Sequence, residues 1–333
     1  MLPSNGNNGW SCLSYIDNTA DTSAATASLD NRGLAYGDGF FTTMGVIDGL
    51  ILWQEYHHQR LISHAKALQL DLDSRSLLAT LQTHAQQLQQ GMLKLIITRA
   101  AQDIRGYGYT PSESGSKCEI WLKSSAMTIA TSKQLHLPDG RLMSMQPFST
   151  AVCLSSQLAC LPPPLAGLKS LNRLDNVLAS GELQSVKAST SLSSTELGSA
   201  DIGEGLLRDM SGHWVEGTMS NLFYQLSNTQ LINMQLINMQ LAESKNIVND
   251  KEYNADYLTN GQWYTPSMAQ SGVAGVMRQV LIDALSTTKY PVVIRALHDE
   301  DLPQLSQLFF CNALRGIMPM SKLKLLTGEM VGF

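Results

Sequence analysis

Segments typical of helices and of strands alternate on both sides of one polar stretch, and this order constrains the fold more than any other feature. Residues 55–70 and 76–90 place apolar side chains at helical spacing, which predicts two amphipathic helices. The strings MLKLIITR (92–99) and CEIWLK (118–123) are rich in β-branched and large apolar residues, which favours strands. The first part of the chain is therefore predicted to combine helices with a sheet.

The dividing stretch, SSAMTIATSKQLHLPDGRLMSMQPFS, is polar and irregular. A chain of 333 residues is long enough for two domains, each with a core of its own. We predict an N-terminal domain at 1–124, an interdomain connection at 125–149 and a C-terminal domain at 150–333.

The second part again mixes both kinds of segment. A strand is predicted at 151–155, and after the Pro-rich turn LPPPLAG the string LNRLDNVLASGELQSV indicates a helix, with Lys169 just before it. Further strands are predicted at GLLRDM, NLFYQL, VVIRA and QLFFCNA, and a further helix at 275–285. The stretches 188–203 and 228–260 are predicted surface insertions, the second containing the tandem repeat LINMQLINMQ. The predicted fold class is mixed α/β.

Composition and charge argue against several classes of partner and compartment. Lys and Arg number 23 and Asp and Glu number 28, a net charge of −5 without a basic run, so we expect no nucleic-acid partner. The five cysteines are scattered and lack a CxxC pair, which argues against disulfides and zinc and fits a reducing cytoplasm. The first residues lack a basic start, and no apolar run approaches spanning length, so we expect neither secretion nor membrane insertion.

Most standard catalytic signatures are missing. The chain has no HExxH, P-loop or GxSxG motif. Gly37 and Gly39 could begin a dinucleotide fingerprint, but its third glycine would stand where the chain has Thr42. His57 and His64 invite a metal or acid–base interpretation, yet a helical histidine is more often packed or solvated than catalytic, so we predict no metal site.

Four separated strings are more informative together. In sequence order they are LAYGDGFFTT (34–43), AGLKSLNRLDNVLA (166–179), EGTMSNLFY (216–224) and SGVAGVMRQ (271–279). In that order they resemble the class IV aminotransferase-like pyridoxal-phosphate enzymes, also called fold type IV. A fifth string, CNALRGIMPM (311–320), is similar to that of the 4-amino-4-deoxychorismate lyases in this class. The resemblance implies a two-domain fold type IV enzyme, like the D-amino-acid aminotransferases.

The resemblance implies a role for two ionisable residues. Lys169 would carry pyridoxal 5'-phosphate as a Schiff base, and burial or nearby positive charge would have to lower its pKa. Glu216 would face the pyridine nitrogen and keep the ring protonated. The motif of the family it resembles places this glutamate five residues before the asparagine of SNLF, as here. The alternatives are a surface lysine before a helix and a turn carboxylate.

The cofactor's phosphate needs positive charge and backbone N–H groups. By resemblance, Arg60 supplies the charge and the start of the 275–285 helix supplies the N–H groups. The predicted cofactor-binding residues beyond Lys169 and Glu216 are Arg60, Ser220, Asn221, Gly275, Val276 and Met277. A helix-surface arginine and helical core packing remain the alternatives for Arg60, Val276 and Met277.

The resemblance also nominates residues that bind the substrate. Asn312 and Leu314 would lie near its ring. Arg105 and Tyr107, from the string IRGYGY, are also nominated, and Arg105 has the charge to meet a carboxylate. The alternative for Arg105 is a solvated loop residue. Some lyases of this kind carry an arginine where this chain has Met44, so its carboxylate contacts are expected to differ.

The activity implied is that of a lyase in folate biosynthesis. It converts a small-molecule substrate, 4-amino-4-deoxychorismate, to 4-aminobenzoate and pyruvate. The KSLN string is also similar to that of D-amino-acid aminotransferases, so a transaminase acting on D- or branched-chain amino acids is the alternative. A cofactor-binding protein without catalysis is a third interpretation, which the presence of Lys169 and Glu216 argues against. The resemblance further implies a homodimer.

Overall fold

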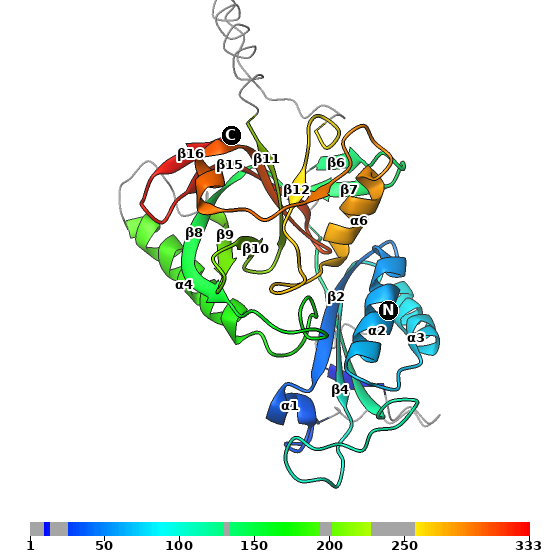
Figure 1. Cartoon of the computed structure of the whole chain (residues 1–333). Coiled ribbons are helices and arrows are strands. Elements are labelled where there is room, and N and C mark those ends of the chain that lie inside the picture. Colours follow the sequence, from blue (N-terminus) through cyan, green and yellow to red (C-terminus); the bar gives the residue numbers. More distant parts are fainter. Residues whose placement is uncertain (1–9, 14–25, 130–132, 193–201, 228–256) are drawn as a thin grey trace, which may run out of the picture.

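A computed structural model describes residues 10–13, 26–129, 133–192, 202–227 and 257–333. It contains two β-sheets, each covered by its own helices, as Figure 1 shows. Most of the two predicted insertions, including the LINMQ repeat, lies outside the described residues. The first five residues of the insertion predicted at 188–203 are helical instead, because α4 extends to Leu192.

The first sheet has five strands, all paired antiparallel in the order β1-β5-β4-β2-β3. Its strands are β1 (Trp10–Cys12), β2 (Gly39–Ile47), β3 (Leu50–Ile51), β4 (Gly91–Arg99) and β5 (Cys118–Ala126). Its helices are α1 (Arg32–Tyr36), α2 (Gln54–Ala67) and α3 (Ser74–Leu88).

Alternation of side chains gives this sheet one apolar face and one mixed face. Phe40 and Met44 of β2 are fully buried and pack with Leu93 of β4 and Leu61 of α2 in one hydrophobic cluster. Because successive strand residues point to opposite faces, Phe41 and the other odd-numbered residues of β2 lie on the face away from that cluster. That second face contributes to the site described below.

The second sheet contains a closed ring of six strands. Its strands are β6 (Lys133–His136), β7 (Leu142–Met145), β8 (Ser149–Leu158), β9 (Ile202–Asp209), β10 (Trp214–Gly217), β11 (Asn221–Leu226), β12 (Tyr264–Thr265), β13 (Val293–Ile294), β14 (Leu305–Asn312), β15 (Gly316–Lys324) and β16 (Met330–Gly332). The pairings run β8-β9-β10-β11-β14-β15 and return from β15 to β8. A ring of this kind has no free edge between its members, and all six strands contribute to one buried cluster.

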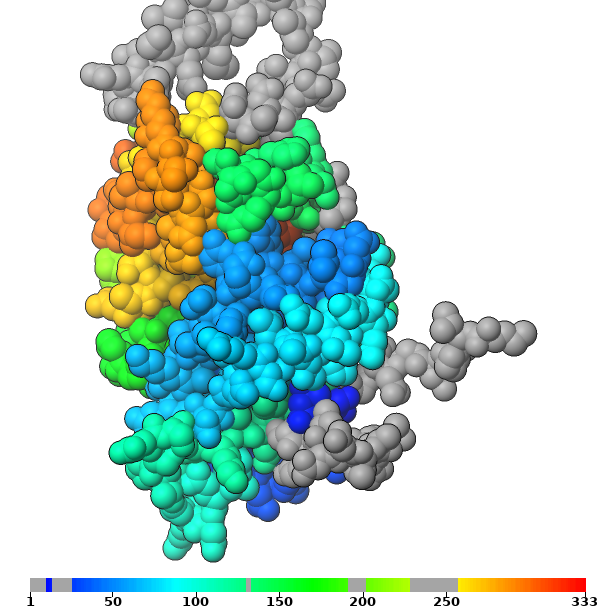
Figure 2. Space-filling view, turned by 90° about the vertical axis from the view of Figure 1, so that its right-hand side faces the viewer, coloured from blue at the N-terminus to red at the C-terminus, as the bar shows by residue number. Residues whose placement is uncertain are grey.

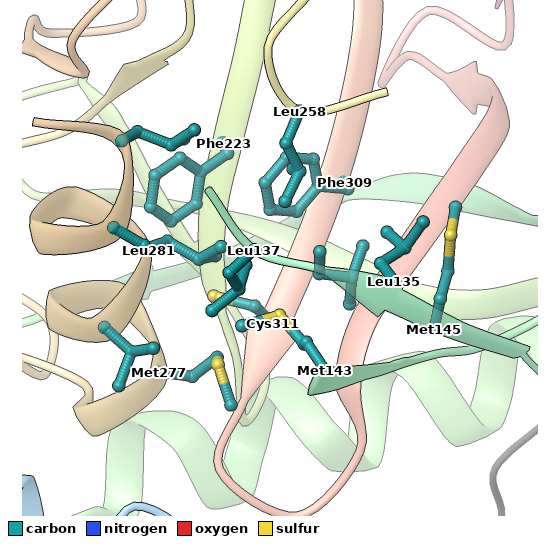
Figure 3. Packing of buried hydrophobic residues seen from close by; sticks show 14 of the residues in the cluster. Leu135, Leu137, Met143, Met145, Phe223, Leu258, Met277, Leu281, Phe309 and Cys311 are labelled. Carbon is teal, nitrogen blue, oxygen red and sulfur yellow. The ribbon is translucent and has the colours of Figure 1, made fainter. Parts of the chain in front are cut away.

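Two helices cover the outside of this ring. Helix α4 (Leu174–Leu192) packs on β8 and β9, and α6 (Val276–Leu285) packs on β14. Figure 3 shows the side chains beneath α6, where Leu281 lies beside Phe223 and Met277 points toward Cys311. The rings of Phe223 and Phe309 stack 5.0 Å apart across neighbouring strands. This packing fixes the start of α6 relative to the ring of strands. A 3₁₀ helix, η2 (Asp299–Gln304), precedes β14.

One expectation needs correction. The stretch 125–149 is not an irregular connection, since β6 and β7 form an antiparallel hairpin within it and β7 pairs with β15. Leu135 and Met143 of this hairpin are buried in the cluster under α6, beside polar neighbours that face outward. The apolar residues are too few and too widely separated to stand out in a polar sequence. The domain boundaries at 124 and 150 stay a prediction.

Strand β5 of the first sheet is followed in the chain by β6 of the second, and helix α2 packs against α6. In Figure 2 the surface of α2 meets that of α6 and the hairpin without a break. No described helix is long and apolar enough to cross a membrane.

Candidate active site

Lys169 lies on the loop between β8 and α4, where the two sheets meet (Figure 1). This loop pairs with the start of β2, because the Phe41 N–H donates to the Lys169 carbonyl at 3.0 Å and Ser170 bridges Phe40. On its other side Gly167 pairs with Val273, in the loop before α6. The first sheet and the loop before α6 therefore hold the segment that carries the lysine.

The amine of Lys169 is placed among positive charges. Its Nζ lies 4.6 Å from the centroid of the Phe41 ring, on the mixed face of the first sheet. The pKa of Lys169 is lowered to about 8, mainly by burial and also by the Arg60 guanidinium, while Glu216 acts in the opposite direction. A substantial fraction of the amine is therefore neutral, and nucleophilic, near neutral pH.

Glu216 is a buried carboxylate on β10, with an exposed fraction of 3%. Its Oε2 accepts the Val273 N–H at 2.9 Å and the side-chain amide of Asn221 at 3.4 Å, and its Oε1 accepts that of Asn176 at 3.4 Å. Burial raises the pKa of Glu216 to about 7, and the Val273 hydrogen bond opposes this shift. A cation beside the carboxylate would restore its ionised form.

Asn221 and a glycine hold the loop before α6 against Glu216. The Asn221 side-chain amide donates to the Val273 carbonyl at 2.8 Å, and Ser271 donates to the buried carboxylate of Asp209 at 2.7 Å. Gly272 has a φ of +74°, and a Cβ there would come within 3.0 Å of Glu216 Oε2. The loop thus needs a glycine to turn beside the carboxylate.

Arg60 extends from α2 of the first sheet to the start of α6. It is 7% exposed, and its guanidinium donates to the Ala274 carbonyl at 2.8 Å and to Thr42 Oγ1 at 3.4 Å. Burial lowers the pKa of Arg60 to about 10, which leaves it charged at neutral pH. A buried cation therefore lies next to the N-terminus of α6.

The N-terminus of α6 has free backbone donors. Gly275 is the N-cap, with no side-chain capping bond, and the first turn has no acidic residue. The N–H groups of Val276 and Met277 in that turn are available to an anion, which the helix dipole favours. A Cβ on Gly275 would come within 1.8 Å of Asn221 Oδ1, so only glycine fits there.

Ser220 lies in the β10–β11 turn, and its hydroxyl is already engaged. It donates to Glu204 Oε2 at 2.7 Å, and Thr218 donates to Glu204 Oε1 at 2.6 Å. Glu204 is a buried acid that the sequence interpretation missed. It fixes the turn between Glu216 and Asn221, so the structure gives Ser220 a place in this turn rather than a contact with Arg60.

Asn312 is the last residue of β14, and Leu314 lies in the turn after it; β14 pairs with β11 beside Asn221. Asn312 Oδ1 accepts the N–H groups of Leu314 and Arg315, and its amide nitrogen makes no hydrogen bond to any described residue. A Cβ on Gly45 would lie 3.5 Å from the Leu314 side chain, so this turn reaches the first sheet. The structure thus brings the turn to the junction of the sheets.

Arg105 and Tyr107 lie on an exposed loop after β4, at the end of the first sheet away from the second sheet (Figure 1). Tyr107 is 82% exposed and stacks edge-on with Tyr36, while Arg32 donates to its carbonyl. Within the described chain, no contact joins Arg105 or Tyr107 to Lys169. The structure does not bring these two residues to the other candidates.

Two further residues beside Lys169 were not nominated from the sequence. His64 of α2 accepts the Lys169 N–H at 2.9 Å. Lys94 of β4 lies 5.8 Å from the Phe41 ring, which also contacts the Lys169 amine, and its charge contributes to the low pKa of Lys169. The only sequence signal for His64 is its spacing, one turn after Arg60, and for Lys94 it is a charge within an apolar strand.

Comparison with known proteins identifies the family of the chain that carries Lys169, Glu216 and Arg60. A family model described as amino-transferase class IV matches residues 39–323, well over half of the chain. The chain belongs to the class IV aminotransferase family. The resemblance in the five strings is thereby confirmed, and so is the mixed α/β, fold type IV prediction.

Individual relatives of this family agree in fold over most of the chain. The chain is 24% identical to an aminodeoxychorismate lyase from Vibrio harveyi over 294 residues, 88% of this chain and 86% of the relative. It is 29% identical to the crystal structure of 4-amino-4-deoxychorismate lyase from Pseudomonas aeruginosa, with a TM-score of 0.65 and coverage of 90% and 88%. A hypothetical aminotransferase from Mycobacterium tuberculosis, in a PLP-bound form, is 16% identical, with a TM-score of 0.60 and coverage of 93% and 88%.

The cluster in this class IV member fits pyridoxal phosphate. Arg60 and Glu216 are both buried, and neither forms an ion pair with another described residue. Buried charges without partners are costly, so both sites suit a ligand of opposite charge. A phosphate at Arg60 and a protonated ring nitrogen at Glu216 would satisfy them, and the charges of both residues act on the Lys169 amine.

Proposed function

We propose that the chain is a pyridoxal-phosphate-dependent lyase that converts 4-amino-4-deoxychorismate to 4-aminobenzoate and pyruvate in folate biosynthesis. One observation carries this proposal. The Lys169 amine, with its lowered pKa, is acted on by the charges of both a buried carboxylate, Glu216, and a buried arginine at the start of a helix, Arg60. The names of the relatives with 24% and 29% identity select the lyase among the reactions that such a site supports.

Lys169 moves the protons in this account. When bound, the cofactor supplies an electron sink for the bond broken at the substrate's amine-bearing carbon. Lys169, once its amine is free, takes the proton from that carbon and returns a proton to the methylene carbon of the departing enolpyruvyl group. Its pKa of about 8 suits both directions of transfer near neutral pH.

Glu216 and Arg60 hold the two ends of the cofactor. Ionised Glu216 keeps a proton on the ring nitrogen, and the hydrogen bonds from Val273 and Asn221 fix the carboxylate's direction. Arg60 and the first turn of α6 bind the phosphate. With both ends bound, the reacting carbon stays beside Lys169, which is the orientation that the reaction requires.

The substrate carries two carboxylates, which need positive partners. Met44 is fully buried under the helices, on the opposite face of β2 from Phe41, so this position offers no contact to substrate. Lys94 lies on the mixed face of the first sheet, near Lys169 and Phe41. We assign one carboxylate to Lys94, and the free amide of Asn312 to the substrate ring.

A homodimer accounts for the exposed loop and for an apolar patch. Leu174, Val177 and Leu178, the α4 patch, are 77%, 61% and 70% exposed and share one side of the helix just after Lys169. Exposed apolar clusters of this kind mark interaction surfaces. We assign the α4 patch to contact with a second copy, whose Arg105 and Tyr107 loop would then complete the site.

The compartment follows from cysteine chemistry. All five cysteines are free thiols in the structure, although Cys12 and Cys160 are accessible to oxidants. Proteins without disulfides suit a reducing environment. We therefore place the reaction in the cytoplasm.

The proposal is tested by incubation with 4-amino-4-deoxychorismate, without an amino donor or a 2-oxo acid. Formation of 4-aminobenzoate and pyruvate supports the lyase. The alternative, a transaminase of the same fold, is favoured by the aminotransferase neighbour. It would instead transfer the amino group of a D- or branched-chain amino acid to a 2-oxo acid and form no 4-aminobenzoate.

A further inference from the structure

His64 binds the backbone of the residue that performs the chemistry. Its Nε2 accepts the Lys169 N–H at 2.9 Å, while the Lys169 carbonyl accepts the Phe41 N–H at 3.0 Å. The backbone N–H and the carbonyl of Lys169 are therefore both hydrogen-bonded. His64 is 4% exposed and packs edge-on against Phe40, which restrains its ring.

The other ring nitrogen connects Lys169 to Arg60. Because Nε2 accepts a hydrogen bond, the proton of a neutral His64 lies on Nδ1, which is 3.2 Å from Ser63 Oγ. The Ser63 hydroxyl in turn donates to the Arg60 carbonyl at 3.2 Å. A chain of three hydrogen bonds thus runs from the Lys169 backbone to the Arg60 backbone.

The charges around His64 keep it neutral. The pKa of His64 is lowered to about 3, first by burial and then by the positive charges of Arg60, Lys169 and Arg173. A protonated ring could not accept the Lys169 N–H. The same cations that lower the pKa of the Lys169 amine therefore maintain the hydrogen bond that holds its backbone.

We propose that His64 is a positioning residue, which fixes the Lys169 backbone relative to Arg60 so that the amine meets the aldehyde of a phosphate-anchored cofactor. The inference rests on the proposed function in one respect, the identity of the cofactor. The two hydrogen bonds of the His64 ring go to the Lys169 backbone and to Ser63, not to the Lys169 amine. His64 therefore favours the covalent attachment of the cofactor to Lys169, and does not contribute to the binding of the phosphate or the ring.

The test compares two forms of the cofactor on the apoprotein. Pyridoxal phosphate can link covalently to Lys169, whereas pyridoxamine phosphate has no aldehyde and binds through its phosphate and ring alone. His64→Phe leaves the Lys169 N–H buried without an acceptor, so we expect a dissociation constant about tenfold higher for pyridoxal phosphate. For pyridoxamine phosphate we expect a change of less than about twofold.

Further variants separate positioning from general damage to the fold. His64→Gln offers an acceptor again and is expected to restore most of the affinity for pyridoxal phosphate. In a Lys169→Ala background, His64→Phe should no longer change that affinity, because the linkage is already lost. His58, on the same helix but bonded to Ser74, provides the matched control as His58→Gln. Ser63→Ala changes an exposed residue of the same chain of hydrogen bonds. It should weaken the binding of pyridoxal phosphate less than His64→Phe does, and should again affect pyridoxal phosphate more than pyridoxamine phosphate.

The inference would be overturned if His64→Phe weakened the binding of both cofactor forms equally. It would also be overturned if His64→Phe weakened the binding of pyridoxal phosphate as much in the Lys169→Ala background as in the wild type. Either result would leave the proposed function intact. If the wild-type apoprotein binds neither form, both the inference and the proposed function fail. If His64→Phe does not fold, Ser63→Ala decides the question, and equal losses there overturn the inference too.

Discussion

At the scale of single residues, the site's chemistry comes from burial without ion pairing. Lys169, Glu216 and Arg60 are held close together, yet none of them neutralises another through an ion pair in the described chain. Each pKa therefore moves toward the neutral form, to about 8, 7 and 10 respectively. At neutral pH Arg60 therefore stays charged, whereas Glu216 becomes fully ionised only with a cation beside it.

The shifted pKa of Lys169 predicts how the apoprotein amine reacts. Reductive methylation at Lys169, followed by peptide mass spectrometry, should accelerate as pH rises through about 8, because the neutral amine is the reactive form. Arg60→Met removes the largest charge that disfavours the protonated amine, so the midpoint should move upward, toward the ordinary value of 10.5. An unchanged midpoint in that variant would contradict the role given to Arg60.

Glu216→Gln keeps the shape of the side chain and its acceptor for Val273, but removes the negative charge. Losing one member of a buried charge pair costs about 2–5 kcal/mol, so we expect kcat to fall roughly thirtyfold or more at saturating cofactor. Steady-state kinetics on the reconstituted protein measure this loss. Glu329→Gln, on the exposed C-terminal turn, is the control, and equal activity in both variants would exclude Glu216 from the site.

At the scale of elements, three loops from distant parts of the chain define the site. They are the loop that carries Lys169, the loop before α6 and the β10–β11 turn, and each is tied to the next by backbone or buried side-chain bonds. Helix α2 contributes Arg60 from the other sheet. A small displacement of one loop is therefore expected to displace the other two as well.

The close contact at the start of α6 gives a test of this coupling. In Gly275→Ala, the new Cβ would come within 1.8 Å of Asn221 Oδ1. We expect a loss of about 1–3 kcal/mol in the free energy of unfolding, together with weaker cofactor binding. Gly181→Ala is the matched control. Its Cβ meets nothing within 4 Å inside α4, and a helical alanine should stabilise by about 1 kcal/mol. Equal stability changes in the two variants would contradict the packing described.

Elements and site residues differ in how far the sequence predicts them. Helix α2, strand β11 and the α6 helix follow from periodicity and apolar runs, and Lys169 and Glu216 follow from their strings. His64 and Glu204 could not be found in this way, because their roles arise only when distant segments pack together. The six-stranded ring needs pairings such as β8 with β15, which lie far apart in sequence and leave no local signal.

At the scale of the whole molecule, a single chain does not gather every candidate. The turn with Asn312 and Leu314 reaches the sheet junction, whereas the loop with Arg105 and Tyr107 lies at the far end of the first sheet (Figure 1). That loop is nevertheless well anchored, because Arg32 donates to the carbonyls of three of its successive residues. An ordered loop with exposed functional groups suits contact with a second copy.

The α4 patch makes this assembly testable. Leu178→Glu places a charge among exposed apolar side chains, and burying that charge in an interface is costly. We expect wild-type protein to sediment as a dimer and Leu178→Glu as a monomer at micromolar concentration. Leu326→Glu, equally a surface leucine but near the C-terminus, should remain dimeric. A wild-type monomer, or a dimer that Leu178→Glu leaves intact, would contradict the assignment of this patch.

The most direct test of the central claim is the product balance of the purified protein with and without its lysine. With 4-amino-4-deoxychorismate as the sole substrate, wild-type protein reconstituted with pyridoxal phosphate should form 4-aminobenzoate and pyruvate in equal amounts. Lys169→Ala should reduce that rate by a factor of about 100 or more, because it removes the group that moves both protons. Equal rates in the two proteins, or no product from either, would contradict the account.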